Sequence, residues 1–520
     1  MSRENIIILV VFAIYMAFMI IVGFFFSTKS NSNKEYVLGG RQLNPWVTAL
    51  SAQASDMSGW LLTGVPGMAF AAVLDAKSAL YVIIGLFIGT WVNWLLVAKR
   101  LRVYTEVAGD SLTIPEYFVK RFDDQKGIIG FIAGVIILFF FTIYTASMFS
   151  AGAKLFQVVF GLDYKIGLVI GVVIVVSYTF LGGFKAVSWT DLFQGLIMFF
   201  ALIIVPVIVY AKLASPNKEI VLNYTKEIFM ISQSNKVPGL DVINSIGWGL
   251  GYFGMPHILV RFMATKDKRT IKPARIIAII WVAITMVAAL FIGIVGVGVV
   301  ERGTIDNEAI FMKIVKSQFS PFMAGILLTA ILAAIMSTAD SQLLVASSAF
   351  STDIYKKHIS KRSKDKTVLL VGRITIIIVA VIASLIAQNP NSSIFKIVSY
   401  AWGGFGASFG PVVLFSLYSR KITKKAAIAS MVTGALTTII FKYGLSRLGG
   451  VFTIYELIPG FILATIVLWI VTIFDKNGVS KKIKNDYAKF KTYLHSNQPI
   501  KIETYEYDDL DITQIDDDYE

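Results

Sequence analysis

The chain has 520 residues, of which 56% are hydrophobic and only 16% are charged. Soluble globular proteins carry about 25% charged residues, so this composition excludes an ordinary soluble enzyme and a disordered protein. The sequence contains no cysteine, which excludes disulfides, thiolate zinc sites, iron–sulfur clusters and cysteine nucleophiles. Its three histidines argue against a histidine-rich metal site.

Apolar runs of membrane-spanning length dominate the sequence. A helix that crosses a bilayer needs about 20 predominantly apolar residues. Thirteen runs approach or exceed that length, with 166–182 the shortest, so the sequence predicts an all-helical integral membrane protein. The runs are 5–27, 45–73, 78–98, 128–159, 166–182, 190–211, 241–262, 275–300, 321–350, 367–387, 394–418, 426–445 and 457–474.

The net charge of +15 could indicate nucleic-acid binding, but the positions of the basic residues favour a membrane interpretation. With the N-terminus outside and thirteen crossings, inner loops carry 33 Lys and Arg residues and outer segments carry 14. Because basic residues concentrate in cytoplasmic loops, this bias predicts an outer N-terminus and a cytoplasmic C-terminus. The basic loops 99–127, 261–275 and 351–366 are therefore expected to be cytoplasmic anchors, with no nucleic acid as partner.

Two of the predicted spans look interrupted. The second contains Gly59, Gly64, Pro66 and Gly67, and the seventh reads GWGLGYFGMPH over residues 247–257. Broken helices occur in membranes only where they line a protein-enclosed cavity, and matched breaks point to a transporter's binding site. The alternative is that these glycines only allow close helix packing.

The two interrupted spans lie five spans apart, which suggests an inverted repeat. Because five is odd, the second group of five starts from the opposite side of the membrane. We therefore expect a first helix and a cytoplasmic loop in 1–44, five-helix repeats in 45–211 and 241–418, and two further helices in 419–474. The cytoplasmic tail, 475–520, is polar, and its acidic end from Glu503 to Glu520 has the composition of a disordered segment.

Asp56 lies within the second span, among hydroxyl and amide side chains. A charged residue at the bilayer centre costs about 2.5–3.5 kcal/mol on insertion scales. An aspartate persists there most readily beside a cation or a water-filled path. The residue therefore marks a candidate ion site.

The ninth span supplies further oxygen atoms. On a helix, the carbonyl of Ala334 lies near the side chains of Ser337 and Thr338, so these three oxygens can converge. An unwound stretch near Ala54 and Met57 would add two free carbonyls, and neutral oxygens suit a hard monovalent cation. The alternative is that the two hydroxyls only bond carbonyls of their own helix.

Several motifs together resemble the sodium/solute symporter family, and within it the proline-transporting members. They cover the membrane part of the chain from about residue 5 to 475 and are specific in combination. The motifs are LGGR at 38–41, SDMSGWLL at 55–62, SWTD at 188–191, the stretch 248–257, AAIMST at 333–338 and YAWGGFG at 400–406.

The resemblance implies thirteen helices around a leucine-transporter-like inverted-repeat core, in the cytoplasmic membrane, with Na⁺ as the coupling ion and no organic cofactor. It assigns sodium binding to the carbonyls of Ala54, Met57 and Ala334 and the hydroxyls of Ser337 and Thr338. It assigns sodium coupling to Asp56, Arg41 and Asp191. Asp340 follows the hydroxyl pair and departs from the pattern of the proline transporters. It is either satisfied by a neighbour or tunes the cation site.

The resemblance also implies that L-proline and the sodium ion are the partners of the chain, within the lipid bilayer and without an obligate protein partner. It assigns the proline pocket to Ser58, Gly59, Tyr144, Trp248, Tyr252 and Pro256. From the residues alone, aromatic side chains on membrane helices are more often packing residues.

The implied function is sodium-coupled uptake of proline by alternating access, not an enzymatic reaction. Three alternatives stay open: sodium-coupled symport of another small solute, proton-coupled symport through Asp56 or Asp191, and a sensor that binds solute without transporting it. A sensor would normally need an output domain, which the tail does not supply.

Overall fold

The computed structural model describes residues 2–27, 33–181, 183–230 and 236–496. Within these ranges the regular elements are all helices, as the composition predicted, and one isolated bridge joins Leu43 and Thr265. The acidic end from Glu503 to Glu520, predicted to be disordered, lies outside the described residues.

Ten helical stretches of the described chain are long and apolar enough to cross a membrane. Within them, α1 is Arg3–Ser27, α6 is Val73–Asn93, α7 is Lys99–Val107, α9 is Ile128–Phe160, α11 is Phe184–Lys212, α15 is Ile271–Gly296, α17 is Pro321–Ser348, α18 is Asp365–Ile386, α19 is Ile394–Tyr418, α20 is Lys424–Tyr443 and α21 is Leu457–Phe474. The π-helical η2 (Trp94–Ala98) joins α6 to α7, and η6 (Ala349–Ile359) extends α17. The predicted runs 45–73, 166–182 and 241–262 hold shorter helices, so the count of thirteen crossings stays a prediction.

The second predicted span is interrupted in its middle. Helix α3 (Pro45–Asp56) ends before Met57, whose ψ of 73° is not helical, and Ser58 is extended. Two short helices follow, α4 (Gly59–Leu62) and α5 (Gly64–Ala71). The break frees backbone groups of residues 54–58 from the regular helical pattern in a fully buried region. The predicted interruption is confirmed.

The seventh predicted span is interrupted as well. Helix α13 (Gly239–Gly247) passes into a 3₁₀ segment, η4 (Trp248–Gly254), and α14 (Pro256–Met263) begins after the extended Met255. Pro256 lacks an N–H and disfavours a helical residue before it, which explains the restart. Gly251 is required by packing, because a Cβ there would lie 1.9 Å from Trp402 Nε1.

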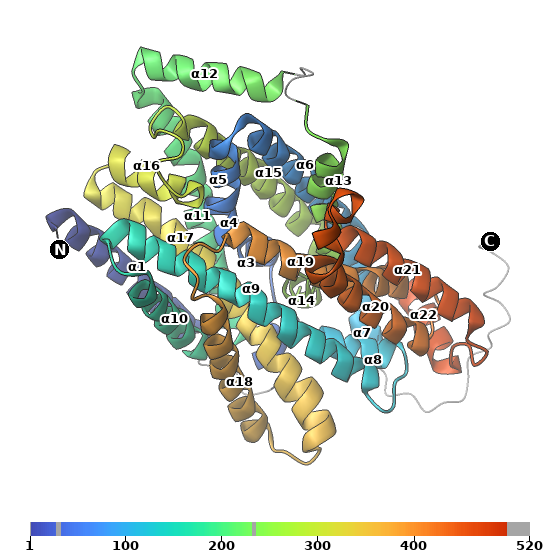
Figure 1. The fold of residues 1–520 in the computed structure, drawn as a ribbon. Helices are drawn as coiled ribbons and strands as arrows, with labels where there is room; N and C mark the ends of the chain where they lie inside the picture. Colours follow the sequence, from blue (N-terminus) through green and yellow to red (C-terminus); the bar gives the residue numbers. More distant parts are fainter. Residues whose placement is uncertain (1, 28–32, 182, 231–235, 497–520) are drawn as a thin grey trace.

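The breaks of the two interrupted segments lie in the interior of the helical bundle (Figure 1). Helix α4 contacts α9, α17 and α19, and η4 packs against α6 and α19. Helix α15 runs alongside α3, α5 and α6. The remaining described helices are α2 (Asn33–Leu38), α8 (Ile114–Arg121), α10 (Tyr164–Leu181), α12 (Ser215–Phe229), α16 (Ile310–Gln318), α22 (Lys481–His495) and the short 3₁₀ turns η1 (Gly39–Arg41), η5 (Asn307–Ala309), η7 (Leu445–Leu448) and η8 (Gly450–Thr453).

Candidate ion and solute site

Ser337 connects the ninth predicted span to the break in the second. Its Oγ donates to the carbonyl of Ala54 at 2.7 Å and to the carbonyl of Ala334 at 3.3 Å. Thr338 Oγ1, one residue further, is buried without a hydrogen-bond partner in the described part of the chain. Met57 is fully buried at the end of α3. The structure therefore brings three of the five predicted sodium ligands, Ala54, Ala334 and Ser337, to one place. Met57 and Thr338 are each close in sequence to one of them.

Asp56 joins the two interrupted segments. Its carboxylate is fully buried, and Oδ2 accepts a 2.8 Å hydrogen bond from Tyr252 OH in η4. The other oxygen, Oδ1, has no hydrogen-bond partner among the described residues. A buried carboxylate with one neutral donor is poorly compensated, and a nearby cation would stabilise its ionised form.

Aromatic rings surround Trp248 on several sides. Its indole stacks on Phe395 with ring centroids 4.6 Å apart and on Tyr455 at 5.5 Å. Trp402 Nε1 donates to the carbonyl of Trp248 at 2.8 Å, and the Trp402 ring meets Tyr252 edge-on at 5.0 Å. Trp248 and Tyr252 therefore belong to one aromatic cluster, which also holds η4 in position.

The other four residues predicted to bind proline are Ser58, Gly59, Tyr144 and Pro256. Ser58 Oγ and Tyr144 OH lie near each other, and neither has a hydrogen-bond partner within 3.5 Å in the described structure. Gly59 begins α4, where a Cβ would lie 3.1 Å from Ala151 of α9. Pro256 is the first residue of α14. Unpartnered buried hydroxyls of this kind are suited to a polar ligand.

Asp191 forms a second buried cluster, which is centred on Arg261. Arg261 donates to Asp191 Oδ2 at 3.1 Å, to Ser51 Oγ at 3.1 Å and to the carbonyl of His257 at 2.9 Å. It also donates to Ser341 Oγ, which in turn lies 3.5 Å from Asp340 Oδ1. The distribution of basic residues predicts that Arg261 belongs to the cytoplasmic loop 261–275. That position is wrong, because its guanidinium is fully buried among these polar groups.

Arg41 lies in a different place from Asp191, on the side of the molecule that holds the basic loops. Its guanidinium donates to Asp110 Oδ1 at 2.8 Å, to Ser111 O at 2.9 Å and to the carbonyl of Met263 at the end of α14. The residue adopts a left-handed conformation, with φ 55°. Arg41 therefore holds three chain segments together and does not contact the cation oxygens.

The basic neighbours of Asp110 stabilise its ionised form. Burial works against the charged form, but the hydrogen bond from Lys34 and the ion pair with Arg41 outweigh it, so the pKa of Asp110 lies below its ordinary value of 3.8. Stability from such a group is complete above the pKa of the unfolded chain and is lost as the pH falls through the lower pKa of the folded chain.

We expect Asp110→Asn to lower the thermal unfolding temperature in detergent, by an amount that corresponds to about 0.5–1 kcal/mol for a partly exposed carboxylate that loses its ion pairs with Arg41 and Lys34. Because the carboxylate is ionised throughout, the difference from the unmodified protein should be the same at pH 6 and pH 8. Asp365→Asn, at the exposed pair with Lys356, is the matched control and should have a smaller effect. A difference that grows or disappears between pH 6 and pH 8 would contradict this assignment.

Comparison with known proteins identifies the family. The family model described as the sodium:solute symporter family matches residues 36–434. The chain belongs to the sodium:solute symporter family. The family resemblance proposed from the motifs is thereby confirmed.

Curated relatives match nearly the whole chain. The sodium/proline symporter of Escherichia coli (strain K12) is 42% identical over 502 residues, which cover 95% of this chain and 98% of the relative. The osmoregulated proline transporter OpuE of Bacillus subtilis (strain 168) is 43% identical over 475 residues, 90% of this chain and 95% of the relative. A sodium/proline symporter of Staphylococcus aureus (strain JH9) is 42% identical over 485 residues, 90% of this chain and 92% of the relative.

Solved structures show the same fold. A Na⁺-coupled sialic acid symporter in a substrate-bound, outward-open state aligns with a TM-score of 0.73 at 19% identity, over 91% of this chain and 98% of that chain. A nucleobase-cation-symport-1 family transporter in a closed conformation aligns with a TM-score of 0.54 at 14% identity, over 89% and 99% of the two chains. The chain therefore has the leucine-transporter-like helical fold that the resemblance implied.

Proposed function

We propose that the protein is a sodium-coupled L-proline symporter of the cytoplasmic membrane, with its N-terminus outside and its C-terminus in the cytoplasm. The observation that carries the proposal is the contact between Tyr252 and Asp56, which joins both interrupted segments. Asp56 lies two residues after Ala54, whose carbonyl accepts from Ser337. Relatives that are about 42% identical and carry the name of proline transporters support the choice of solute.

Sodium would bind to the neutral oxygens of Ala54, Met57, Ala334, Ser337 and Thr338. Carbonyl and hydroxyl oxygens are the donors that hard cations prefer. Ser337 Oγ already lies within hydrogen-bond distance of two of these carbonyls, so rotation of its O–H would leave three oxygens facing one ion. The ionised Asp56 would stabilise the ion from nearby.

Proline would bind next to the ion, against the aromatic cluster. Its ring is apolar and would pack against the aromatic cluster that contains Trp248 and Tyr252, and its ammonium group can interact with an aromatic face. Its carboxylate can accept from the unpartnered hydroxyls of Ser58 and Tyr144. The N-terminus of α14 at Pro256 favours negative charge on the same side.

The energy for uptake would come from the sodium ion. A tenfold sodium gradient is worth about 1.4 kcal/mol, and one charge crossing 100 mV adds about 2.3 kcal/mol. Together they could sustain roughly 500-fold accumulation at one sodium per proline. Coupling also requires proline to tighten sodium binding by the factor by which sodium tightens proline binding.

Uptake of labelled proline into proteoliposomes tests the proposal. An imposed sodium gradient should drive accumulation at constant pH, and proline should compete better than other amino acids. Accumulation with a proton gradient but without sodium would contradict sodium coupling. Proline binding without any net uptake would instead identify a sensor, and preferential competition by another solute would correct the substrate.

Ser337→Ala and Thr338→Ala should each raise the sodium concentration for half-maximal uptake. Loss of one neutral ligand should cost about 0.5–1.5 kcal/mol, or roughly twofold to tenfold in apparent sodium affinity. Ser408→Ala removes a hydroxyl that is equally buried in α19 and serves as the matched control. Sodium dependence that is unchanged in both variants would remove this pair from the cation site.

Trp248→Ala should weaken apparent proline affinity more than apparent sodium affinity. Loss of the indole removes a stacking surface and loosens its contacts with Phe395 and Tyr455, so we expect at least a roughly tenfold rise in the proline concentration for half-maximal uptake. Trp469→Ala, at a half-buried position in α21, is the control. A larger effect on sodium than on proline would place Trp248 outside the solute pocket.

A further inference from the structure

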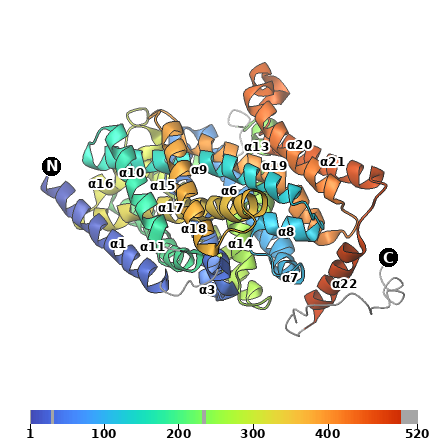
Figure 2. The same cartoon turned by 90° about the horizontal axis from the view of Figure 1, so that it is seen from below.

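Helix α22 is a short amphipathic helix after the last membrane span, and no site described above uses it. Its residues Ile483, Tyr487, Phe490 and Leu494 are buried, whereas Lys481, Lys484 and Lys491 on its outer face are exposed. The spacing of the buried residues places them on one side of the helix. The helix is therefore docked on the body of the protein through an apolar stripe. Figure 2 shows it on the side of the molecule that holds α7 and α8.

One group of contacts attaches α22 to α7 and to the turn after α14. The ring of Phe490 stacks on Tyr104 of α7 with centroids 4.4 Å apart and planes 9° apart. Lys268 Nζ donates to the carbonyls of Tyr493 and Ser496, at the C-terminal end of α22. Helix α7 is itself joined to this turn, because Arg102 Nε donates to the carbonyl of Thr265 at 2.8 Å.

A second group of contacts attaches α22 to α8. Lys482 forms an ion pair with Asp123, just after α8, at 3.6 Å. The guanidinium of Arg121 lies 5.9 Å from the centre of the Tyr487 ring. Helix α8 is anchored to the end of α19, because Arg121 also donates to the carbonyls of Ser416 and Ser419. It also meets α7 directly, where the Arg121 guanidinium lies 5.1 Å from the centre of the Tyr104 ring. Helix α22 thus bridges the α7–α14 side and the α8–α19 side.

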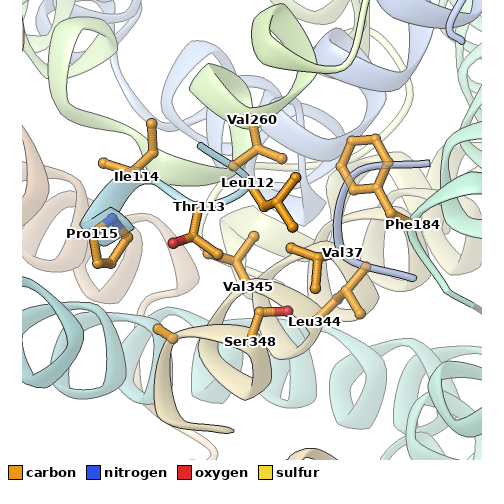
Figure 3. Close-up of a pocket in the computed structure, with 11 residues that line it drawn as sticks. Val37, Leu112, Thr113, Ile114, Pro115, Phe184, Val260, Leu344, Val345 and Ser348 are labelled. Carbon is orange, nitrogen blue, oxygen red and sulfur yellow. The ribbon is translucent and has the colours of Figure 1, made fainter. Parts of the chain in front are cut away.

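A pocket lies between the same two parts. It is lined by Val260 of α14, Leu112 and Pro115 at the start of α8, and Leu344, Val345 and Ser348 of α17 (Figure 3). Ser348 is three helical turns from Ser337 along α17, so the pocket lies on the basic-loop side of the proposed ion site. Movement of α14 away from α8 would widen it, and that movement would have to break one set of α22 contacts.

We propose that α22 is a clamp that holds the pocket closed toward the cytoplasm and must release its attachment to α8 before solute leaves on that side. The inference rests on the proposed function for its direction. Alternating access in this type of fold is largely a rigid movement of one helix group against another. A helix that contacts both groups on one side stabilises the state that is closed on that side.

Labelling of a single cysteine tests the clamp in the 520-residue chain, which has no native cysteine. Ser348→Cys reports access to the pocket when a membrane-impermeant thiol reagent is added on the side of the basic loops, without proline. Adding Phe490→Ala should increase the labelling rate at least about threefold, because the stack on Tyr104 is lost. Lys268→Met should act in the same direction, and Lys484→Ala, on the exposed face of α22, should leave the rate unchanged.

Cross-linking tests the effect of fixing α22 in its attached position. Asp123→Cys with Lys482→Cys, joined by a short cleavable thiol cross-linker, should reduce sodium-driven uptake at least about tenfold, and cleavage of the linker should restore it. The pair Asp123→Cys with Lys484→Cys controls for the reagent. Full uptake in the cross-linked protein, or equal labelling in the Phe490, Lys268 and Lys484 variants, would overturn the clamp. Faster labelling in the Phe490 and Lys268 variants of a protein that transports no proline would support the clamp and reject the proposed solute.

Discussion

Replacing Asp56 with asparagine should almost eliminate sodium-driven uptake while the protein still folds. The carboxylate is fully buried, and its one hydrogen bond in the described structure comes from the neutral hydroxyl of Tyr252. Asparagine has the same shape and can still accept from Tyr252, so the aromatic cluster should survive. What it lacks is the negative charge that stabilises a cation beside the free carbonyls. Charge-assisted interactions contribute about 1.5–3 kcal/mol, so apparent sodium affinity should fall roughly 10-fold to 150-fold.

The measurement is the initial rate of uptake as a function of sodium concentration at constant pH. Tyr252→Phe is the matched control, since it removes the hydrogen bond to Asp56 and keeps both the charge and the ring. It should change sodium affinity much less than Asp56→Asn does. If Asp56→Asn has the sodium dependence of the unmodified protein, the carboxylate plays no part in coupling and the ion site must be sought elsewhere.

The interrupted helices were predictable because local chemistry causes them. Pro256 cannot continue a helix through its missing N–H, and the glycines of 247–254 allow a tight segment to pass beside Trp402. The proximity of Ser337 Oγ to the Ala334 carbonyl follows from helical spacing, and the structure places the Ala54 carbonyl beside the same hydroxyl. These features depend on residues that are near in sequence or on a break that the sequence itself shows.

The Arg261 cluster and the docked α22 depend on contacts between distant residues, which the sequence pattern does not show. Arg261 stands at the edge of an apolar run. At such a position the sequence pattern does not distinguish an arginine that is exposed in a loop from one that is buried in the protein. Arg261 pairs with Asp191, which lies 70 residues away. The sequence of α22 resembles a polar tail, because its four buried apolar residues stand among lysines. The helical spacing of those four residues does, however, indicate an amphipathic helix.

Arg261→Met should destabilise the protein more than any other single change proposed for it. The substitution keeps an unbranched side chain of similar reach but leaves Asp191 and Asp340 buried without the arginine charge. Removing one partner of a buried ion pair typically costs about 3–5 kcal/mol, because the remaining charge stays uncompensated. We expect a lower yield of folded protein and a much lower thermal unfolding temperature in detergent. Arg362→Met, on an exposed loop, should have almost no effect.

A double variant separates this electrostatic explanation from simple loss of packing. Asp191→Asn in the Arg261→Met background removes the uncompensated charge, so it should recover a large part of the lost unfolding temperature even though it deletes a second native group. If the two substitutions acted independently, their losses of unfolding free energy would instead add. Recovery should not extend to sodium-driven uptake, because the double variant has lost a residue assigned to sodium coupling. If the double variant is less stable than Arg261→Met alone, Arg261 contributes mainly through its hydrogen bonds to Ser51, Ser341 and the His257 carbonyl and not through its charge.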